Sequence, residues 1–215
     1  MLNNMNNKPS LLIIGNSNVG KTSITKLLLP NPNVFKGKIG KDPGSTLLIK
    51  PITQPNLPYQ IVDMPGFGYM KGTSQRRMEH IKTQIVIHVE KHHENYFLGL
   101  IILSVLRIED EIIKYSIQNQ TTIPLSFELI QFLSEFNIPL IVILNKIDKI
   151  TNIDKERLIP LLIDSAKGDG INLVHIDKFN RENKNEIPFL EFSAVKKINL
   201  GKLKQMIEYY FRNLK

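Results

Sequence analysis

The sequence lacks cysteine altogether, so it has neither a disulfide framework nor a thiolate metal site. This absence favours a reducing compartment and predicts a cytoplasmic protein. The sequence also lacks an apolar run that could span a bilayer, because the longest one, residues 97–106, is short and contains a glycine and a serine. That run predicts a buried strand and no membrane association. The first residues, Met-Leu-Asn-Asn-Met-Asn-Asn-Lys, lack the apolar core of a signal peptide, and we expect a disordered lead over residues 1–9.

Acidic residues are in the minority: 20 Asp and Glu stand against 28 Lys and Arg, which gives a formal net charge of +8. This excess favours an anionic partner such as RNA, without identifying one. A chain of 215 residues with 42% hydrophobic residues can fill a single core. We therefore expect one domain, over residues 10–215, in a monomeric protein.

The strongest motif is Leu-Leu-Ile-Ile-Gly-Asn-Ser-Asn-Val-Gly-Lys-Thr-Ser at residues 11–23, a phosphate-binding loop between a strand and a helix. Gly15 and Gly20 let the backbone N–H groups converge on a β-phosphate. Lys21 would neutralise phosphate oxygens, and the Thr22 hydroxyl would ligate Mg²⁺. The alternative is a glycine-rich turn with an incidental lysine. The residues predicted to line the phosphate site are Gly15, Asn16, Ser17, Asn18, Val19, Gly20, Lys21, Thr22 and Ser23.

Strands and helices alternate along the chain. Apolar runs predict strands at residues 11–14, 47–52, 59–62, 101–106, 139–144 and 189–192. Periodicity and helix breakers predict helices at 21–29, 74–91, 109–115, 124–136, 153–166 and 199–214. We expect segment 31–45, which is rich in glycine and lysine, to be a mobile basic loop, and segment 167–186 to be a polar loop or excursion. The pattern predicts an α/β fold: a mostly parallel six-stranded sheet with helices on both faces and ligands at the carboxyl ends of its strands.

The run Asn-Lys-Ile-Asp at residues 145–148 predicts specificity for guanine. The Asp148 carboxylate would accept hydrogen bonds from the N1–H and the exocyclic amine of guanine, whereas adenine offers a lone pair and a C–H at that edge. Asn145 would brace the phosphate loop, and the stem of Lys146 would cover the ring. Alone, the run would be better explained as a solvated turn. A second run at another strand end completes the predicted base site: Ser193, Ala194 and Val195.

The run Asp-Met-Pro-Gly at residues 63–66 predicts a magnesium and γ-phosphate sensor. Asp63 would hold a water on Mg²⁺, and the Gly66 N–H would report the γ-phosphate. Thr46, preceded by Gly44 and Ser45, would complete the metal shell through its hydroxyl. Both loops would be ordered by GTP and released on hydrolysis, which describes a switch. For Pro-Gly alone, an ordinary turn is the better explanation.

These motifs, in this order, resemble the translation-factor class of Ras-like P-loop GTPases, and more narrowly the EngB family, above all its archaeal branch. The signatures are Gly-x-Ser-Asn-Val-Gly-Lys at 15–21, Pro-Gly-x-Thr at 43–46 and Asp-Met-Pro-Gly-Phe-Gly at 63–68. The resemblance implies a Ras-like P-loop GTPase domain that binds GTP and GDP with Mg²⁺ and hydrolyses GTP. It also implies a role in assembly of the large ribosomal subunit, with that subunit or its rRNA as partner. The sequence departs from the family at Thr22, at Ser45 and at residues 103–107, which lack an acidic residue.

Phe67 stands where Ras-type proteins keep a glutamine that orients the attacking water. The resemblance therefore implies slow turnover, raised by a partner or by a potassium ion held partly by Asn18. The alternative is that Asn18 only tightens the loop through a local hydrogen bond. The catalytic candidates are Lys21, Thr46, Gly66 and Asn18.

Two rival functions stay open: an ATP-using P-loop kinase or ATPase, which would leave Asp148 without a role, and a nucleotide-dependent scaffold that never hydrolyses. His88 and His92 share a helix face next to His93, where a solvated face is a better explanation than zinc. Segment 107–122 stays unassigned. Basic residues near the C-terminus fit an RNA footprint or a solvated helix equally well: Lys196, Lys197, Lys202, Lys204, Arg212 and Lys215.

Overall fold

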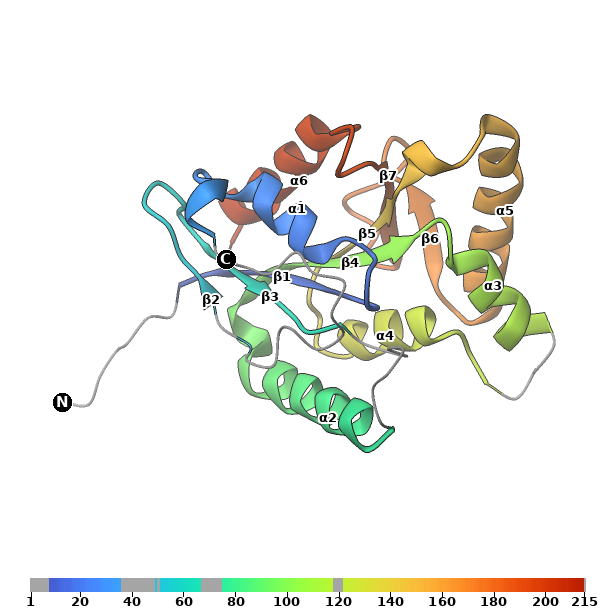
Figure 1. Ribbon diagram of the computed structural model, residues 1–215, viewed down its shortest axis with the longest axis horizontal. Helices are drawn as coiled ribbons and strands as arrows, with labels where there is room; N and C mark the ends of the chain where they lie inside the picture. The colour runs from blue at the N-terminus through green and yellow to red at the C-terminus, as the bar shows by residue number, and fades with distance from the viewer. Residues whose placement is uncertain (1–7, 36–48, 50, 67–74, 118–121, 215) are drawn as a thin grey trace.

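A seven-stranded sheet forms the centre of the described part of the chain, as the computed structural model shows (Figure 1). The structure describes residues 8–35, 49, 51–66, 75–117 and 122–214. Along the sheet the strand order is β2-β3-β1-β4-β5-β7-β6, and every neighbouring pair is parallel except β2 with β3. The strands are β1 (Ser10–Gly15), β2 (Pro51–Ile52), β3 (Gln60–Asp63), β4 (Tyr96–Ser104), β5 (Leu140–Asn145), β6 (Asn172–His175) and β7 (Glu186–Phe192).

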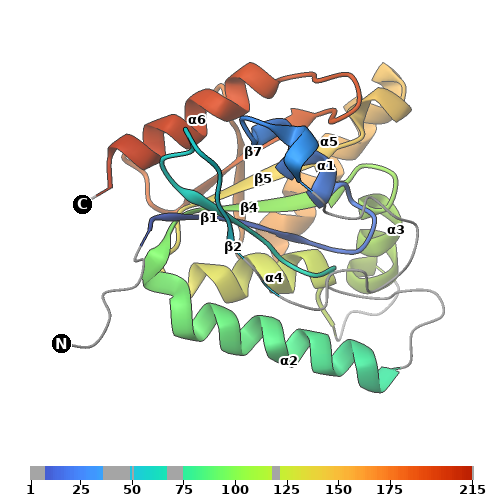
Figure 2. The same cartoon turned by 60° about the vertical axis from the view of Figure 1, so that its left-hand side comes forward.

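Helices cover both faces of this sheet, which follows from the alternation of side chains along each strand. In β1, Leu11 and Ile13 pack into one core with α1 and α6, whereas Leu12 and Ile14 pack into the opposite core with α2, α3, α4 and α5. Figure 2 shows α6 and α2 on opposite sides of the strands. The helices are α1 (Lys21–Leu28), α2 (Gln75–His92), α3 (Ile108–Ile112), α4 (Leu125–Ser134), α5 (Asn152–Gly168) and α6 (Leu200–Arg212). Shorter turns lie at Pro32–Val34, His93–Asn95, Ile113–Ile117 and Ile147–Lys149.

The central strands are buried on both faces, and this explains their continuous apolar runs. Every residue of β1, β4 and β5 is buried. Their registers align the carboxyl ends of the strands at one edge of the sheet, with Ser104 beside Asn145 and Asn145 beside Phe192. On the other side of β1, Asp63 ends β3 opposite Ile13. The parallel sheet therefore brings motifs from distant parts of the sequence to the same edge.

The α/β fold with helices on both faces is confirmed, but the predicted count of six strands is wrong. The missing strand, β6, lies within segment 167–186, which the sequence presented as a polar loop. It pairs in parallel with β7 at the edge of the sheet, and only Leu173 of its four residues is buried. One buried residue leaves too little apolar pattern for a sequence-based prediction. Residues 1–7 of the expected lead and residues 36–45 of the expected basic loop lie outside the described residues.

Candidate nucleotide-binding site

The predicted phosphate loop joins β1 to α1, and its two glycines are required by close contacts. Gly15 has φ 150°, and a Cβ there would lie 2.2 Å from the carbonyl oxygen of Ile102 in β4. Gly20 has φ 105°, and a Cβ there would lie 2.2 Å from Asn145 Nδ2. Any side chain at Gly20 would therefore displace the amide that holds the loop.

Side chains donate hydrogen bonds to the loop's carbonyl groups. Lys21 Nζ donates to the carbonyls of Gly15 at 2.9 Å and Asn16 at 2.8 Å. Lys146 Nζ donates to the carbonyl of Asn18 at 2.6 Å. A peptide whose carbonyl points outward turns the next N–H inward, so this arrangement favours the concave row of donors that binds phosphate.

Lys21 and Asp63 form a buried pair of opposite charges beside the loop. Burial lowers the pKa of Lys21 to about 8, and the nearby Asp63 opposes that shift. Burial also raises the pKa of Asp63 to about 6, against the opposing effects of Lys21 and of the Thr22 hydrogen bond. Both groups thus carry charge in a poorly solvated place, which suits a site for a charged ligand.

A hard cation fits the polar atoms around Asp63. Thr22 Oγ1 donates to Asp63 Oδ2 at 3.2 Å. Asp63 Oδ1 is buried and has no hydrogen-bond partner among the described residues. A carboxylate with a free buried oxygen next to a hydroxyl is the donor set that Mg²⁺ prefers.

The segment after β3 lies against the phosphate loop. A Cβ at Gly66 would be 2.2 Å from Ser17 Oγ and 2.9 Å from Ser17 Cα, so only glycine fits there. The structure thus places Gly66 next to Ser17 of the phosphate loop. Gly44, Ser45, Thr46 and Phe67 lie outside the described residues.

The predicted base site joins the ends of β5 and β7. Ser193 Oγ donates to Asp148 Oδ1 at 2.6 Å, and this hydrogen bond holds the pKa of Asp148 below its usual value. Asn145 Oδ1 accepts from the N–H of Ala194 at 3.1 Å, while Asn145 Nδ2 donates to the Val19 carbonyl at 2.7 Å. The buried Asn145 therefore connects the base site to the phosphate loop.

Two side chains that no sequence motif indicated also contact the loop. Arg107 Nη1 donates to the Ser17 carbonyl at 3.1 Å, and Asn16 Nδ2 donates to Glu111 Oε2 at 3.4 Å. Both come from the previously unassigned segment after β4. The only signal in the sequence was their place just beyond a buried strand, where ligand-binding residues gather.

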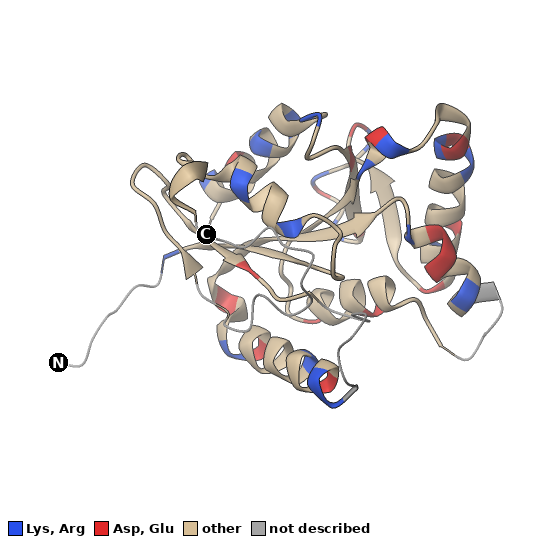
Figure 3. Ribbon diagram, viewed as in Figure 1, with Lys and Arg blue, Asp and Glu red and all other residues tan. Residues whose placement is uncertain are grey.

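The other candidates of the sequence contribute less to this site. The rings of His88 and His92 lie 4.6 Å apart, and no group of three metal-ligating side chains occurs in the described ranges. Lys and Arg recur along α6 (Figure 3), but Lys202 pairs with Asp177 at 2.7 Å, and Arg212 pairs with Glu208. No helix in the part of the chain that the structure describes is long and apolar enough to cross a membrane.

The fold and the clustered motifs define the class of protein, a P-loop GTPase. Residues 10–146 match the protein family described as 50S ribosome-binding GTPase. The chain belongs to the EngB family of GTP-binding proteins.

Relatives and a solved structure agree with this membership. A probable GTP-binding protein EngB of Methanococcus aeolicus is 28% identical over 159 residues, 74% of this chain and 66% of the relative. Its counterpart in Pyrococcus horikoshii is 36% identical over 146 residues, 68% of this chain and 64% of the relative. The chain thus matches slightly less than two thirds of their lengths. A crystal structure of a probable GTP-binding protein EngB is similar with a TM-score of 0.71 at 27% identity, over 95% of this chain and 99% of that one.

Proposed function

We propose that this protein binds GTP with Mg²⁺, hydrolyses it to GDP and phosphate, and acts as a molecular switch in assembly of the large ribosomal subunit. The observation that carries the proposal is the double contact of Asn145, which ties Val19 in the phosphate loop to Ala194 beside Asp148. One buried amide thereby couples a phosphate site to a site suited to guanine.

The phosphate groups would be bound by the loop amides of residues 15–23 and by Lys21. The Lys21 ammonium lies inside the loop, where its charge is poorly screened and so acts strongly on the negative charge that develops on phosphate oxygens during hydrolysis. Gly66, which lies against Ser17, would sense the γ-phosphate through its N–H. This contact supports a switch whose state depends on the third phosphate.

Thr22 and Asp63 would hold Mg²⁺, Thr22 through its hydroxyl and Asp63 through a water, with Thr46 as the proposed additional ligand. Bound there, the ion would neutralise charge on the phosphate oxygens. The unpartnered Asp63 oxygen supports this assignment.

Guanine specificity would come from Asp148, with Ser193, Ala194, Val195 and Lys146 around the base. The Ser193 hydroxyl fixes one Asp148 oxygen and favours the ionised carboxylate, the form that accepts two hydrogen bonds from guanine. This contact favours GTP over the ATP that a P-loop kinase or ATPase would use, since adenine offers no donors to the Asp148 carboxylate.

Multiple-turnover phosphate release with GTP and with ATP tests the enzymatic part. We expect release from GTP alone, and slow turnover. GTP binding with no phosphate release would instead support a non-hydrolysing scaffold.

The ribosomal part is supported by the family and by the excess of 8 positive charges. Sucrose-gradient profiles of cells depleted of this protein test it. We expect immature large subunits to accumulate, and unchanged profiles would contradict the assembly role while leaving the GTPase proposal standing.

A further inference from the structure

Five consecutive carbonyl groups of the phosphate loop, from residue 15 to residue 19, each accept a hydrogen bond from a side chain. Four of these bonds come from Lys21, Asn145 and Lys146, which belong to the sequence motifs. The fifth comes from Arg107, whose Nη1 lies 3.1 Å from the Ser17 carbonyl oxygen. Arg107 stands between β4 and α3, 90 residues from Ser17, and belongs to no motif.

We propose that Arg107 is a positioning residue of the nucleotide site, which holds the Ser17 carbonyl outward so that the following N–H faces the phosphates. The proposal rests on the proposed function. Because a peptide unit is planar, its carbonyl and the next N–H point in opposite directions. An inward Ser17 carbonyl would both repel a phosphate oxygen and remove one donor from the concave row.

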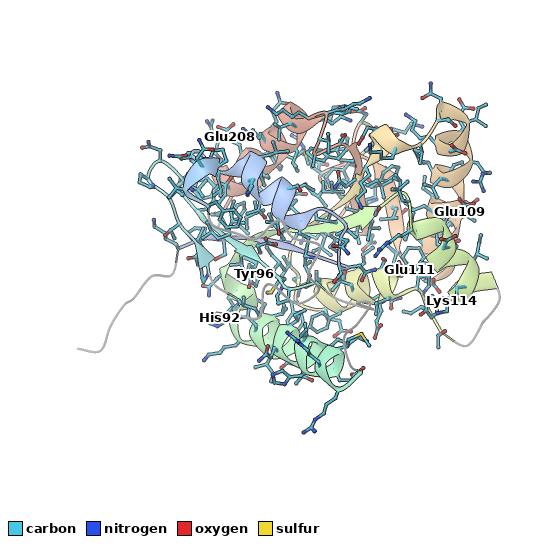
Figure 4. All side chains as sticks on the ribbon, viewed as in Figure 1. His92, Tyr96, Glu109, Glu111, Lys114 and Glu208 are labelled. Atoms are coloured by element: carbon cyan, nitrogen blue, oxygen red, sulfur yellow. The ribbon has the colours of Figure 1, made fainter. Side chains whose placement is uncertain are left out.

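Glu111 anchors the segment that carries Arg107. Its Oε1 accepts from the Ser126 N–H at 2.6 Å, and its Oε2 accepts from Ser126 Oγ at 3.0 Å, at the start of α4. The same Oε2 accepts from Asn16 Nδ2 at 3.4 Å. Figure 4 labels Glu111 and Glu109, which leave α3 toward different neighbours: Glu109 pairs with Arg157 of α5.

This anchor makes residues 107–111 a fixed support rather than a loose surface turn. A cavity of about 40 Å³ lies beside it, lined by Asn16, Ser104, Arg107, Glu111 and Ser126 among others. The buried Ser104 hydroxyl has no partner among the described residues. A space of that size has room for a water molecule between the support and the loop.

The charge of Arg107 adds to its hydrogen bond. Arg107 and Lys146 donate to the adjacent carbonyls of Ser17 and Asn18, so two cations lie close together at the loop. Burial, and next the charge of Arg107, lower the pKa of Lys146. Their mutual repulsion is relieved when an anion binds next to both. Arg107 therefore favours a bound nucleotide through geometry and through charge.

The experiment measures the dissociation rates of fluorescent GDP and of a fluorescent non-hydrolysable GTP analogue from the full chain with Mg²⁺. Arg107→Met keeps most of the aliphatic stem and removes the donor, whereas Arg107→Lys keeps a charged donor. We expect dissociation about tenfold faster in Arg107→Met, the effect of one hydrogen bond from a charged group, and within about threefold of wild type in Arg107→Lys.

Arg157→Met is the matched control, since it also removes an arginine that contacts α3, through Glu109, but not the loop. We expect wild-type dissociation from it. Equal rates in Arg107→Met and wild type would overturn the proposal, as would equal acceleration in Arg107→Met and Arg157→Met or a lack of rescue in Arg107→Lys. If Arg107→Met does not fold, Arg107→Ala, which also removes the donor, takes its place in each of these comparisons. A wild-type protein that binds neither nucleotide would refute the proposed function itself.

Discussion

A single amide side chain determines how the two halves of the nucleotide site meet. Asn145 is 2% exposed, and its two polar atoms are each used once, on Val19 and on Ala194. Gly20 leaves room for it, because a Cβ there would come within 2.2 Å of Asn145 Nδ2. The buried Asn145 side chain and the absence of a side chain at Gly20 therefore set the distance between the proposed phosphate and base sites.

We expect Asp148→Asn to move the preference of the protein from guanosine to xanthosine nucleotides. An amide donates where the carboxylate accepted, and xanthine has a carbonyl in place of the guanine amine. Competition between GTP and XTP for the site is the measurement. Asp177→Asn, an exposed acidic residue bound to Lys202, is the control and should keep guanine preference. Unchanged preference in a folded Asp148→Asn protein would remove Asp148 from the base site.

We also expect GTP turnover to be faster in potassium than in sodium at equal ionic strength, and Asn18→Ala to abolish the difference. Asn18 has φ 62°, is exposed, and makes no side-chain hydrogen bond within the described part of the chain, so its oxygen is free to bind a cation. Phosphate release in both salts, with and without ribosomal subunits, is the measurement. Equal rates in the two salts would contradict the potassium role. They would mean that Asn18 is present only because asparagine tolerates the left-handed backbone at this turn.

At the scale of elements, helix α2 has one face buried in the core and another that is partly exposed to solvent. Ile81, Ile85 and Val89 face the core, four residues apart, while the rings of His88 and His92 contact each other at an angle of 45° on the half-exposed side. Burial lowers the pKa of His88 to about 4, helped by the charges of His92 and Lys91. The folded helix therefore disfavours a proton that the unfolded chain accepts.

This shift predicts a pH dependence of stability. Between pH 6.5 and pH 4 the unfolded state binds more protons at His88 than the folded state, so the free energy of unfolding falls as pH falls through that window. From pH 7 to pH 5 we expect wild type to lose about 1 kcal/mol more than His88→Gln, a value discounted for solvent screening. Urea unfolding at both pH values measures it, with His80→Gln on the same helix as control. Parallel losses in wild type and His88→Gln would refute the shift.

At the scale of the whole molecule, nucleotide binding would be linked to folding because the proposed site is built from the ends of five strands: β1, β3, β4, β5 and β7. The loop after β1 contacts Gly66 after β3, Arg107 after β4 and Lys146 after β5. Asn145, at the end of β5, in turn accepts a hydrogen bond from Ala194 after β7. A ligand bound there adds stability to the folded state only. A bound nucleotide would therefore stabilise the whole sheet edge, because its contacts come from several strands and not from one motif.

We therefore expect GDP or GTP with Mg²⁺ to raise the melting temperature of wild type and not of Lys21→Ala. At a ligand concentration of about 100 times the dissociation constant the gain is about 2.7 kcal/mol. For a domain of this size that gain corresponds to roughly 5–10 °C. Thermal unfolding with and without nucleotide measures the shift. Lys26→Ala, in the same helix, should keep it, and a shift retained by Lys21→Ala would contradict the role of Lys21.

Sequence patterns were sufficient to locate the elements whose defining residues are contiguous in the chain. The phosphate loop is a strand, a turn and a helix within residues 11–23, so spacing alone located it, and the apolar runs located β1, β4 and β5 because both faces of these strands are buried. The family followed from the order of these motifs. The edge strand β6 was not predicted, because only one of its residues is buried and its apolar pattern is therefore weak.

The side chains from distant segments that complete the site could be identified only in the folded molecule. Arg107 reaches Ser17 across 90 residues and Glu111 reaches Asn16 across 95, and no short pattern in either segment encodes such a contact. The register of β4 against β1 and β5 brings them together, and that register depends on the packing of both cores. Contiguous motifs can be recognised in the sequence, whereas contacts between residues that are distant in the sequence depend on how the sheet and its helices pack.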